Sequence, residues 1–262
     1  MTTGGLDPDQ RAGLRLGLLS AGVAGLVVLV LPLAVLVRDQ WSPLVSLDSD
    51  LASSAHRAVV AHAWLLRAAQ VLTHLGAPAA VEAVGALVAI VLLAKGYRRS
   101  ALYLFVCIAG GYLLSTLGKF AVGRARPVFP DPVAHARGLS FPSGHAAGAA
   151  TFWLSLAVLA APRLPARRRG ALLVGALIVG GVVAVTRVLL GVHYPTDVTA
   201  GLLLGWGWVV ACTALFATWR TDQGANREGK TGDGSTDQVL EEGLEQARSQ
   251  GSSRRRRESE AS

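Results

Sequence analysis

Two histidines in this sequence have neighbours that could give them a chemical role. His193 is followed four residues later by Asp197, and a carboxylate that accepts one imidazole N–H leaves the other ring nitrogen free to attack a substrate. His145 ends the run Phe141-Pro-Ser-Gly-His, just before an apolar stretch. Ser143 can cap the helix that this stretch predicts, and free N–H groups at a helix start bind anions. Two such histidines can divide phosphoryl transfer, since one attacks phosphorus while the other protonates the departing oxygen.

Three basic residues could hold an anionic substrate beside these histidines. Lys119 and Arg126 are seven residues apart, so a helix that continues to Pro127 would present both on one face. An ammonium group beside a forked guanidinium suits a tetrahedral phosphate. Arg187 is at the outer end of a predicted membrane span, where an ionisable residue is costly unless it is used or paired. Gly144 allows a ligand to approach the backbone closely.

Each of these motifs has a simpler explanation when it is taken alone. Basic side chains can extend toward a membrane interface, a histidine can follow an ordinary helix cap, and a His–Asp pair can support a helix start. Three independent coincidences would be needed to place all of them at the same membrane face. We therefore interpret them as one phosphate-binding site.

The elements that would position these residues are membrane-spanning helices. The chain is 52% hydrophobic, and its apolar runs, separated by charged gaps, reach roughly 18–22 residues, the length that crosses a bilayer as a helix. The sequence predicts an all-α fold, a polytopic membrane bundle of six transmembrane helices. We expect the spans at about 14–37, 76–94, 101–118, 146–161, 171–190 and 198–217.

The remaining segments divide the chain into three parts. Residues 1–13 form an N-terminal segment, 14–218 the membrane domain, and 219–262 a polar tail that we expect to be disordered. The segment 38–75 places Leu47, Leu51, Ala55, Val59 and Leu66 at near-helical spacing, which favours an amphipathic helix along the interface. We expect its histidines to have solvated or interfacial roles. Both cysteines lie in predicted spans, which argues against a disulfide framework or a cysteine metal site.

Charge predicts the orientation of the bundle. The short gaps 95–100 and 162–170 are rich in lysine and arginine, so we expect them, and both termini, to be cytoplasmic. The gaps 38–75, 119–145 and 191–197 then lie outside. Lys119, Arg124, Arg126 and Arg137 contradict this rule because they lie on the side expected to be poor in basic residues. An anionic substrate would explain them.

The three motifs resemble the signature motifs of the type-2 phosphatidic acid phosphatase superfamily, which also contains vanadium-dependent haloperoxidases. The matching segments are Lys119 through Pro127, Pro142-Ser-Gly-His145, and Arg187 with His193 and Asp197. One departure is Thr186, where the family usually has serine; the hydroxyl is kept, so we expect little consequence.

The resemblance implies a core like that of acid phosphatases and haloperoxidases, and a role for each motif residue. His193 would be the nucleophile that forms a phosphohistidine, Asp197 would orient it, and His145 would be the general acid. The residues implied to hold the phosphate oxygens are Lys119, Arg126, Ser143, Gly144 and Arg187. It implies no metal and no cofactor, and the residues agree, since no carboxylate cluster is placed to bind magnesium.

The sequence therefore predicts a metal-independent phosphatase of the plasma membrane that acts on a lipid phosphate. Its substrate would be a phosphatidic acid-like lipid or a polyprenyl mono- or diphosphate. The protein would be embedded in the lipid bilayer, and nucleic acid is not an expected partner. A haloperoxidase is disfavoured because those relatives are soluble. A non-catalytic lipid-phosphate binder or transporter on the same fold is the second alternative, although such a protein would usually lack one of the catalytic histidines.

Overall fold

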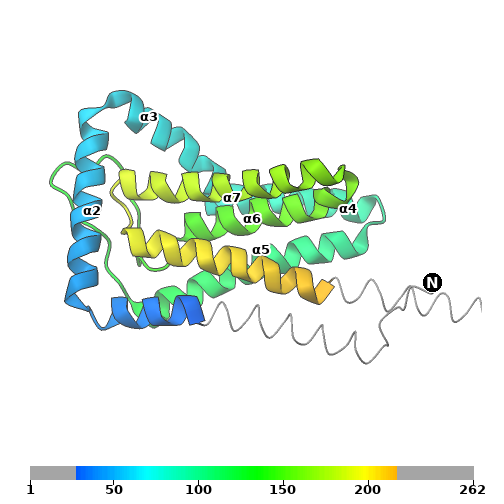
Figure 1. Cartoon of the computed structure of the whole chain (residues 1–262), viewed down its shortest axis with the longest axis horizontal. Coiled ribbons are helices and arrows are strands. Elements are labelled where there is room, and N and C mark those ends of the chain that lie inside the picture. The colour runs from blue at the N-terminus through cyan, green and yellow to red at the C-terminus, as the bar shows by residue number, and fades with distance from the viewer. Residues whose placement is uncertain (1–27, 217–262) are drawn as a thin grey trace, which may run out of the picture. The chain divides into compact units, whose positions relative to one another are not determined.

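The computed structural model describes residues 28–216, which form helices and loops with no strand among them. Figure 1 shows a bundle of long helices lying side by side, with one helix crossing its end. In chain order the elements are a helix over Val28–Arg38, α2 (Ser42–Ala61), α3 (Ala63–Leu72), the 3-10 turn η1 (Thr73–Gly76), α4 (Pro78–Ala94), α5 (Arg98–Val122), α6 (Gly144–Ala160), the 3-10 turn η2 (Ala161–Arg163), α7 (Ala166–Leu189) and a helix over Pro195–Phe216.

The helix starts follow local sequence signals. Pro78 and Pro195 are the first residues of their helices, where the absence of an N–H group does no harm. Ser143 caps α6, and its hydroxyl accepts a hydrogen bond from the N–H of Ala146 at 3.5 Å. α5 ends at Val122, and the following Gly123 has a φ of 70°, a conformation that favours glycine at helix ends.

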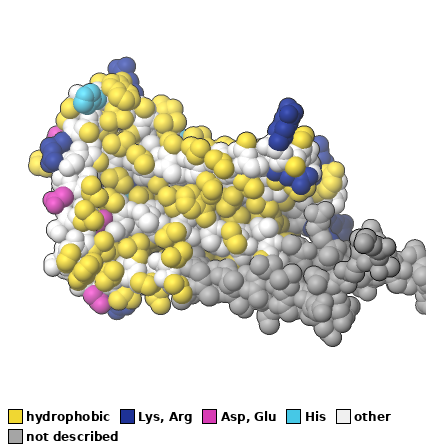
Figure 2. All heavy atoms as spheres, viewed as in Figure 1, with side chains coloured by type: hydrophobic (Ala, Val, Ile, Leu, Met, Phe, Trp, Pro, Cys, Tyr) yellow, Lys and Arg dark blue, Asp and Glu magenta, His cyan; other side chains and the backbone are white. Residues whose placement is uncertain are grey.

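The predicted spans agree with this architecture. Four helices within 28–216 are long and apolar enough to cross a membrane, and two bent helix pairs raise the number to as many as six. The last five predicted spans coincide with α4, α5, α6, α7 and Pro195–Phe216 to within a few residues. The first predicted span is described only from residue 28 onward, and the predicted segments 1–13 and 219–262 lie outside the described residues. In Figure 2, hydrophobic side chains cover most of the visible face of the bundle, and charged ones gather toward its two ends.

Helix α6 is the central element of the bundle. It contacts α4, α5 and α7, and two glycines allow the Pro195–Phe216 helix to approach it closely. A Cβ atom at Gly201 would lie 2.6 Å from the carbonyl oxygen of Ser143, and one at Gly205 would lie 2.7 Å from that of Ala147. The start of α6 and the start of the last helix are therefore held against each other.

Helix α2 corrects one expectation. It makes an angle of 91° with Val28–Arg38 and crosses the end of the bundle (Figure 1). Its buried face consists of Asp48, Ala52, His56 and Val59, whereas the predicted apolar residues Leu47 and Leu51 are exposed. His56 is not solvated, because its ring stacks on Phe129 with centroids 4.1 Å apart. Val59, one of the predicted apolar residues, lies on the buried face, and Asp48 and His56 lie there too because Arg124 and Phe129 are their partners.

Candidate active site

Helix ends at one end of the bundle carry the motif residues. Lys119 lies in the last turn of α5, His145 in the first turn of α6, and Arg187 in the last turn of α7. Asp197 lies in the first turn of the Pro195–Phe216 helix, with His193 just before it. The α4–α5 and α6–α7 connections are at the opposite end, while α2 and the 123–143 loop lie at the motif end (Figure 1).

His193 is oriented through both of its ring nitrogens. Arg126 Nη1 donates to Nε2 at 2.9 Å, so Nε2 carries a lone pair. The Nδ1 atom lies 3.4 Å from Asp197 Oδ2 and 3.3 Å from the hydroxyl of Ser140. Burial lowers the pKa of His193 to about 4, although Asp197 opposes this shift. A neutral imidazole with a proton on Nδ1 and a lone pair on Nε2 is the form that can act as a nucleophile.

Asp197 is fully buried and is held by several donors. Arg124 Nη1 donates to Oδ1 at 2.9 Å, the backbone N–H of Tyr194 donates to Oδ2 at 2.9 Å, and the hydroxyl of Ser140 also donates to Oδ2. The N–H of Ser143 donates to the backbone oxygen of Asp197 at 2.9 Å. That last bond ties the second motif to the third.

The two cations of the first motif converge, but the predicted reason was wrong. α5 ends at Val122, so Arg126 is in a loop and does not share a helix face with Lys119. Lys119 Nζ and Arg126 Nη2 nevertheless donate to the same carbonyl oxygen, that of Leu139, at 3.0 and 3.1 Å. Gly123 ends the helix early, and the loop then turns the guanidinium toward the lysine.

The start of α6 has open space beside it. A Cβ atom at Gly144 would have no neighbour closer than 3.9 Å, the nearest being the hydroxyl of Ser115. His145 follows directly and lies within electrostatic range of Arg126, Arg187 and His193. Free backbone donors beside an open space are suited to an anion.

Arg187 is buried and only partly satisfied. Its Nη1 donates to the hydroxyl of Thr73 at 2.9 Å, and its buried Nε has no hydrogen-bond partner. The hydroxyl of the preceding Thr186 donates to the carbonyl oxygen of Val183 at 2.6 Å, a hydrogen bond within α7.

Three of the supporting residues had no assigned role in the sequence. Arg124 stood out only as a basic residue on an unexpected side, and Ser140 and Thr73 carried no signal at all. Each acts through a contact between segments more than 50 positions apart, which a local sequence motif cannot show.

Within residues 28–216, no group of three or more His, Cys, Asp or Glu side chains is placed to hold a metal ion.

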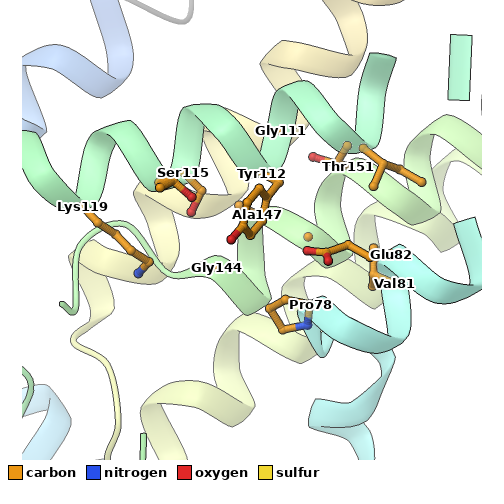
Figure 3. A pocket seen from close by; sticks show the side chains of 13 residues that line it. Pro78, Val81, Glu82, Gly111, Tyr112, Ser115, Lys119, Gly144, Ala147 and Thr151 are labelled. Carbon is orange, nitrogen blue, oxygen red and sulfur yellow. The ribbon is translucent and has the colours of Figure 1, made fainter. Parts of the chain in front are cut away.

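A cavity of about 100 Å³ opens from this site between α4, α5 and α6. Lys119 and Gly144 line it at the end near the motifs, and Figure 3 shows Tyr112, Ser115 and Glu82 along it. Much of the remaining lining is small or apolar, including Pro78, Val81, Ile108, Gly111, Ala147 and Gly148.

Comparison with known proteins identifies the family. Residues 100–221 match the PAP2 superfamily. The chain is 31% identical over 165 residues to phosphatidylglycerophosphatase B of Bacillus subtilis, covering 60% of this chain and 78% of that protein. The chain belongs to the PAP2 superfamily. It is also 39% identical over 122 residues to lipid A 1-phosphatase of Rhizobium etli, and this match covers 43% of the chain but only 48% of that relative.

A solved structure supports the same assignment. The crystal structure of a transmembrane PAP2 type phosphatidylglycerolphosphate phosphatase from Bacillus subtilis matches with a TM-score of 0.65 and 26% identity, over 78% of this chain and 96% of that one. The PAP2 fold is thus shared over almost the whole length of the solved protein. Membership of the PAP2 superfamily is what the three motifs predict.

Proposed function

We propose that the protein is an integral membrane phosphatase that removes the terminal phosphate of a lipid through a phosphohistidine on His193, without a metal ion. The observation that carries this proposal is the pair of contacts on the His193 ring. Arg126 meets Nε2, and Asp197 lies beside Nδ1. In the proposed reaction Arg126 would move its hydrogen bond from Nε2 to an oxygen of the bound phosphate, which would free the lone pair to attack and leave the cation beside the phosphate.

The reaction has two steps. First, His193 Nε2 attacks phosphorus, the bond from phosphorus to the ester oxygen breaks, and His145 gives its proton to the departing oxygen. In the second step His145 takes a proton from water, the resulting hydroxide attacks phosphorus, and the P–N bond breaks to release phosphate. Asp197 stabilises the positive charge that the His193 ring acquires.

The phosphate oxygens would be held by groups that already converge. Lys119 and Arg126 meet at the carbonyl oxygen of Leu139, which a phosphate oxygen would replace as their partner. Arg187 offers its unpaired Nε, and the start of α6 offers backbone N–H groups beside Gly144. These donors would stabilise the extra charge of the five-coordinate phosphorus.

The alcohol part of the substrate would occupy the cavity between α4, α5 and α6. This cavity begins at Lys119 and Gly144 and runs between apolar helices (Figure 3), which suits a lipid whose phosphate lies at the membrane surface. The related proteins are named for phosphatidylglycerol phosphate and for lipid A. We therefore place the substrate among membrane-anchored phosphates, either phosphatidic acid-like or polyprenyl mono- or diphosphates.

Phosphate release by purified protein, measured over a panel of these lipids, tests the proposal. We expect at least one lipid to be hydrolysed in EDTA, and we expect vanadate to inhibit, because it adopts the geometry of the transferring phosphorus. A protein that binds these lipids without releasing phosphate would be a binder or transporter. Activity lost in EDTA and restored by magnesium would disprove the metal-independent mechanism.

A further inference from the structure

Arg124 lies beside the proposed nucleophile but contacts neither His193 nor the open space at the start of α6. Its Nη1 donates to Asp197 Oδ1 at 2.9 Å and to the hydroxyl of Thr196 at 2.7 Å. Its Nη2 donates to Asp48 Oδ2 at 2.7 Å. The guanidinium also lies over the ring of Tyr194, with Cζ 3.9 Å from the centroid. The side chain is only 11% exposed, so these contacts are shielded from water.

Asp48 reaches this site from α2, the helix that crosses the end of the bundle. It is 1% exposed, which is unusual for a carboxylate unless it is paired. Besides Arg124, it accepts from the N–H of Thr196 at 3.0 Å and from the hydroxyl of the same residue. Asp48 thus binds both the arginine and the first turn of the helix that carries Asp197.

The two nitrogens of Arg124 that form these bonds are occupied by carboxylates on opposite sides. A phosphate would have to displace Asp48 or Asp197 to bind there. The partners of Arg126 are instead backbone carbonyl oxygens and the His193 ring, and Arg187 has an Nε without a partner. The contacts instead fix where Asp197 Oδ1 lies, and hence where Oδ2 meets the His193 ring. A bidentate guanidinium clamp of this kind sets direction as well as charge.

We propose that Arg124, held by Asp48 of α2, is a positioning residue that orients Asp197 and thereby the nucleophile His193. This inference rests on the proposed function, because positioning matters only if His193 attacks phosphorus. It gives α2 a part in catalysis, since that helix supplies the buried anchor of the arginine. The expected consequence is a loss in the rate of the chemical step with little change in substrate affinity.

The experiment compares kcat and KM for phosphate release in Arg124→Ala, Asp48→Asn and the double variant, each purified in detergent. Outer partners that orient a catalytic group contribute about 10–100-fold, so we expect kcat to fall by that factor in each single variant, with KM changed less than about threefold. The loss in the double variant should be smaller than the product of the two single losses, because Asp48 acts partly through the arginine and partly through its bonds to Thr196. Added guanidinium should restore part of the activity of Arg124→Ala, and urea, which is similar in shape but uncharged, should not.

Matched controls come from α2 itself. Asp50→Asn changes an exposed carboxylate two residues from Asp48, and Arg57→Ala changes an exposed arginine; both should keep the unsubstituted activity. If Arg124→Ala does not fold, Asp48→Asn decides, and unchanged kcat in a folded Asp48→Asn protein overturns the proposal. Multiplying effects in the double variant, or a loss confined to KM, also overturn it. If the unsubstituted protein releases no phosphate from any lipid, it is the proposed function that fails.

Discussion

At the scale of single residues, the two histidines differ in their surroundings. His193 is buried between a cation at Nε2 and a carboxylate at Nδ1, whereas His145 follows the capping residue of a helix beside open space. The first environment favours a neutral ring with a fixed tautomer, and the second lets a ring reach a departing oxygen. The two proposed roles therefore follow from position and do not depend on any difference in residue type.

The roles of the two histidines can be distinguished by substitution. We expect His193→Ala to lower turnover by about 10³-fold or more, because no other nucleophile replaces it. His145→Ala should also be severely impaired, but a substrate with a good leaving group should let a phospho-enzyme accumulate, since attack needs no proton donor in that case. Radiolabel retained on denatured protein, lost on brief acid treatment, measures this species. Near-normal activity of His193→Ala would contradict the mechanism.

The dependence of activity on pH follows from the environment of His193. Its pKa is lowered to about 4 by burial, so the neutral attacking form persists as the pH falls until that value is reached. We expect kcat/KM to fall at acidic pH when His193 is protonated, with a midpoint near pH 4. This is well below the ordinary histidine pKa of about 6.5. The measurement uses an alkyl phosphate whose own second ionisation is titrated separately. A midpoint near pH 6.5 after that correction would mean that His193 is not buried in the active protein.

The sequence could predict the residues that we propose to touch the substrate, but not those that support them. His145, His193, Asp197 and the cations stood in recognisable local patterns. Asp48 and Arg124 stood in no such pattern, because they contact each other across 76 positions of the sequence. A buried ion pair between distant segments leaves no periodic or local signal in one sequence.

At the scale of elements, the bundle was predictable because apolar runs of sufficient length must form helices in a membrane. The details that depend on packing were not. The end of α5 at Gly123 and the orientation of α2 both follow from tertiary contacts, since Gly123 allows the loop to fold back and α2 buries Asp48 and His56. The error at α5 came from extending a helical pattern past Gly123 to Pro127, and the error at α2 concerned the surroundings of His56.

Close packing of the last helix on α6 gives a prediction at this scale. Gly201→Ala would place a methyl group 2.6 Å from the carbonyl oxygen of Ser143, so the helix must shift, at about 1–3 kcal/mol. Because that helix carries Asp197, we expect activity to fall about 10–100-fold. Gly181→Ala in α7 is the matched control, since its added methyl meets nothing within 4 Å. Thermal unfolding in detergent and phosphate release measure both effects; equal behaviour of the two variants would disprove the packing argument.

The cavity between α4, α5 and α6 can be tested by filling it. Thr116 lines the cavity, so Thr116→Trp should raise KM for a long-chain lipid phosphate by about tenfold, the loss expected when part of an apolar contact is removed. Hydrolysis of a small water-soluble aryl phosphate should change less than about threefold, because that substrate needs only the phosphate site. Leu117→Trp is the control, since Leu117 is 55% exposed and does not line the cavity. Parallel losses on both substrates would place the lipid elsewhere.

At the scale of the whole molecule, the site and the basic loops lie at opposite ends of the bundle. The motif residues lie at the ends of α5 and α7 and at the starts of α6 and the Pro195–Phe216 helix. The α4–α5 and α6–α7 connections lie at the other end (Figure 1). This arrangement agrees with the predicted span count, because one helix more or fewer between motifs would have separated them across the bilayer.

The loop charges then select which end faces the cytoplasm. Lys95, Arg98 and Arg99 flank the first of these connections and Arg163, Arg167, Arg168 and Arg169 the second, and short basic loops remain on the cytoplasmic side. We therefore predict that the active site opens on the non-cytoplasmic face. Single cysteines in a variant lacking Cys107 and Cys212, both buried, test this orientation. Val128, which is 92% exposed in the 123–143 loop, and Ala166, which is exposed at the start of α7, are suitable positions.

In intact cells, Val128→Cys should react with an impermeant thiol reagent, and Ala166→Cys should react only after permeabilisation. Phosphate release by each variant, measured before labelling, shows that the cysteine has not disturbed the fold. The reverse pattern would refute the orientation but leave the catalytic assignment intact, because that assignment depends only on the motifs sharing one end of the bundle. Equal labelling of both positions in intact cells would place the two ends on the same side of the membrane. No arrangement of α6 as a spanning helix allows that result, so it would overturn the span assignment itself.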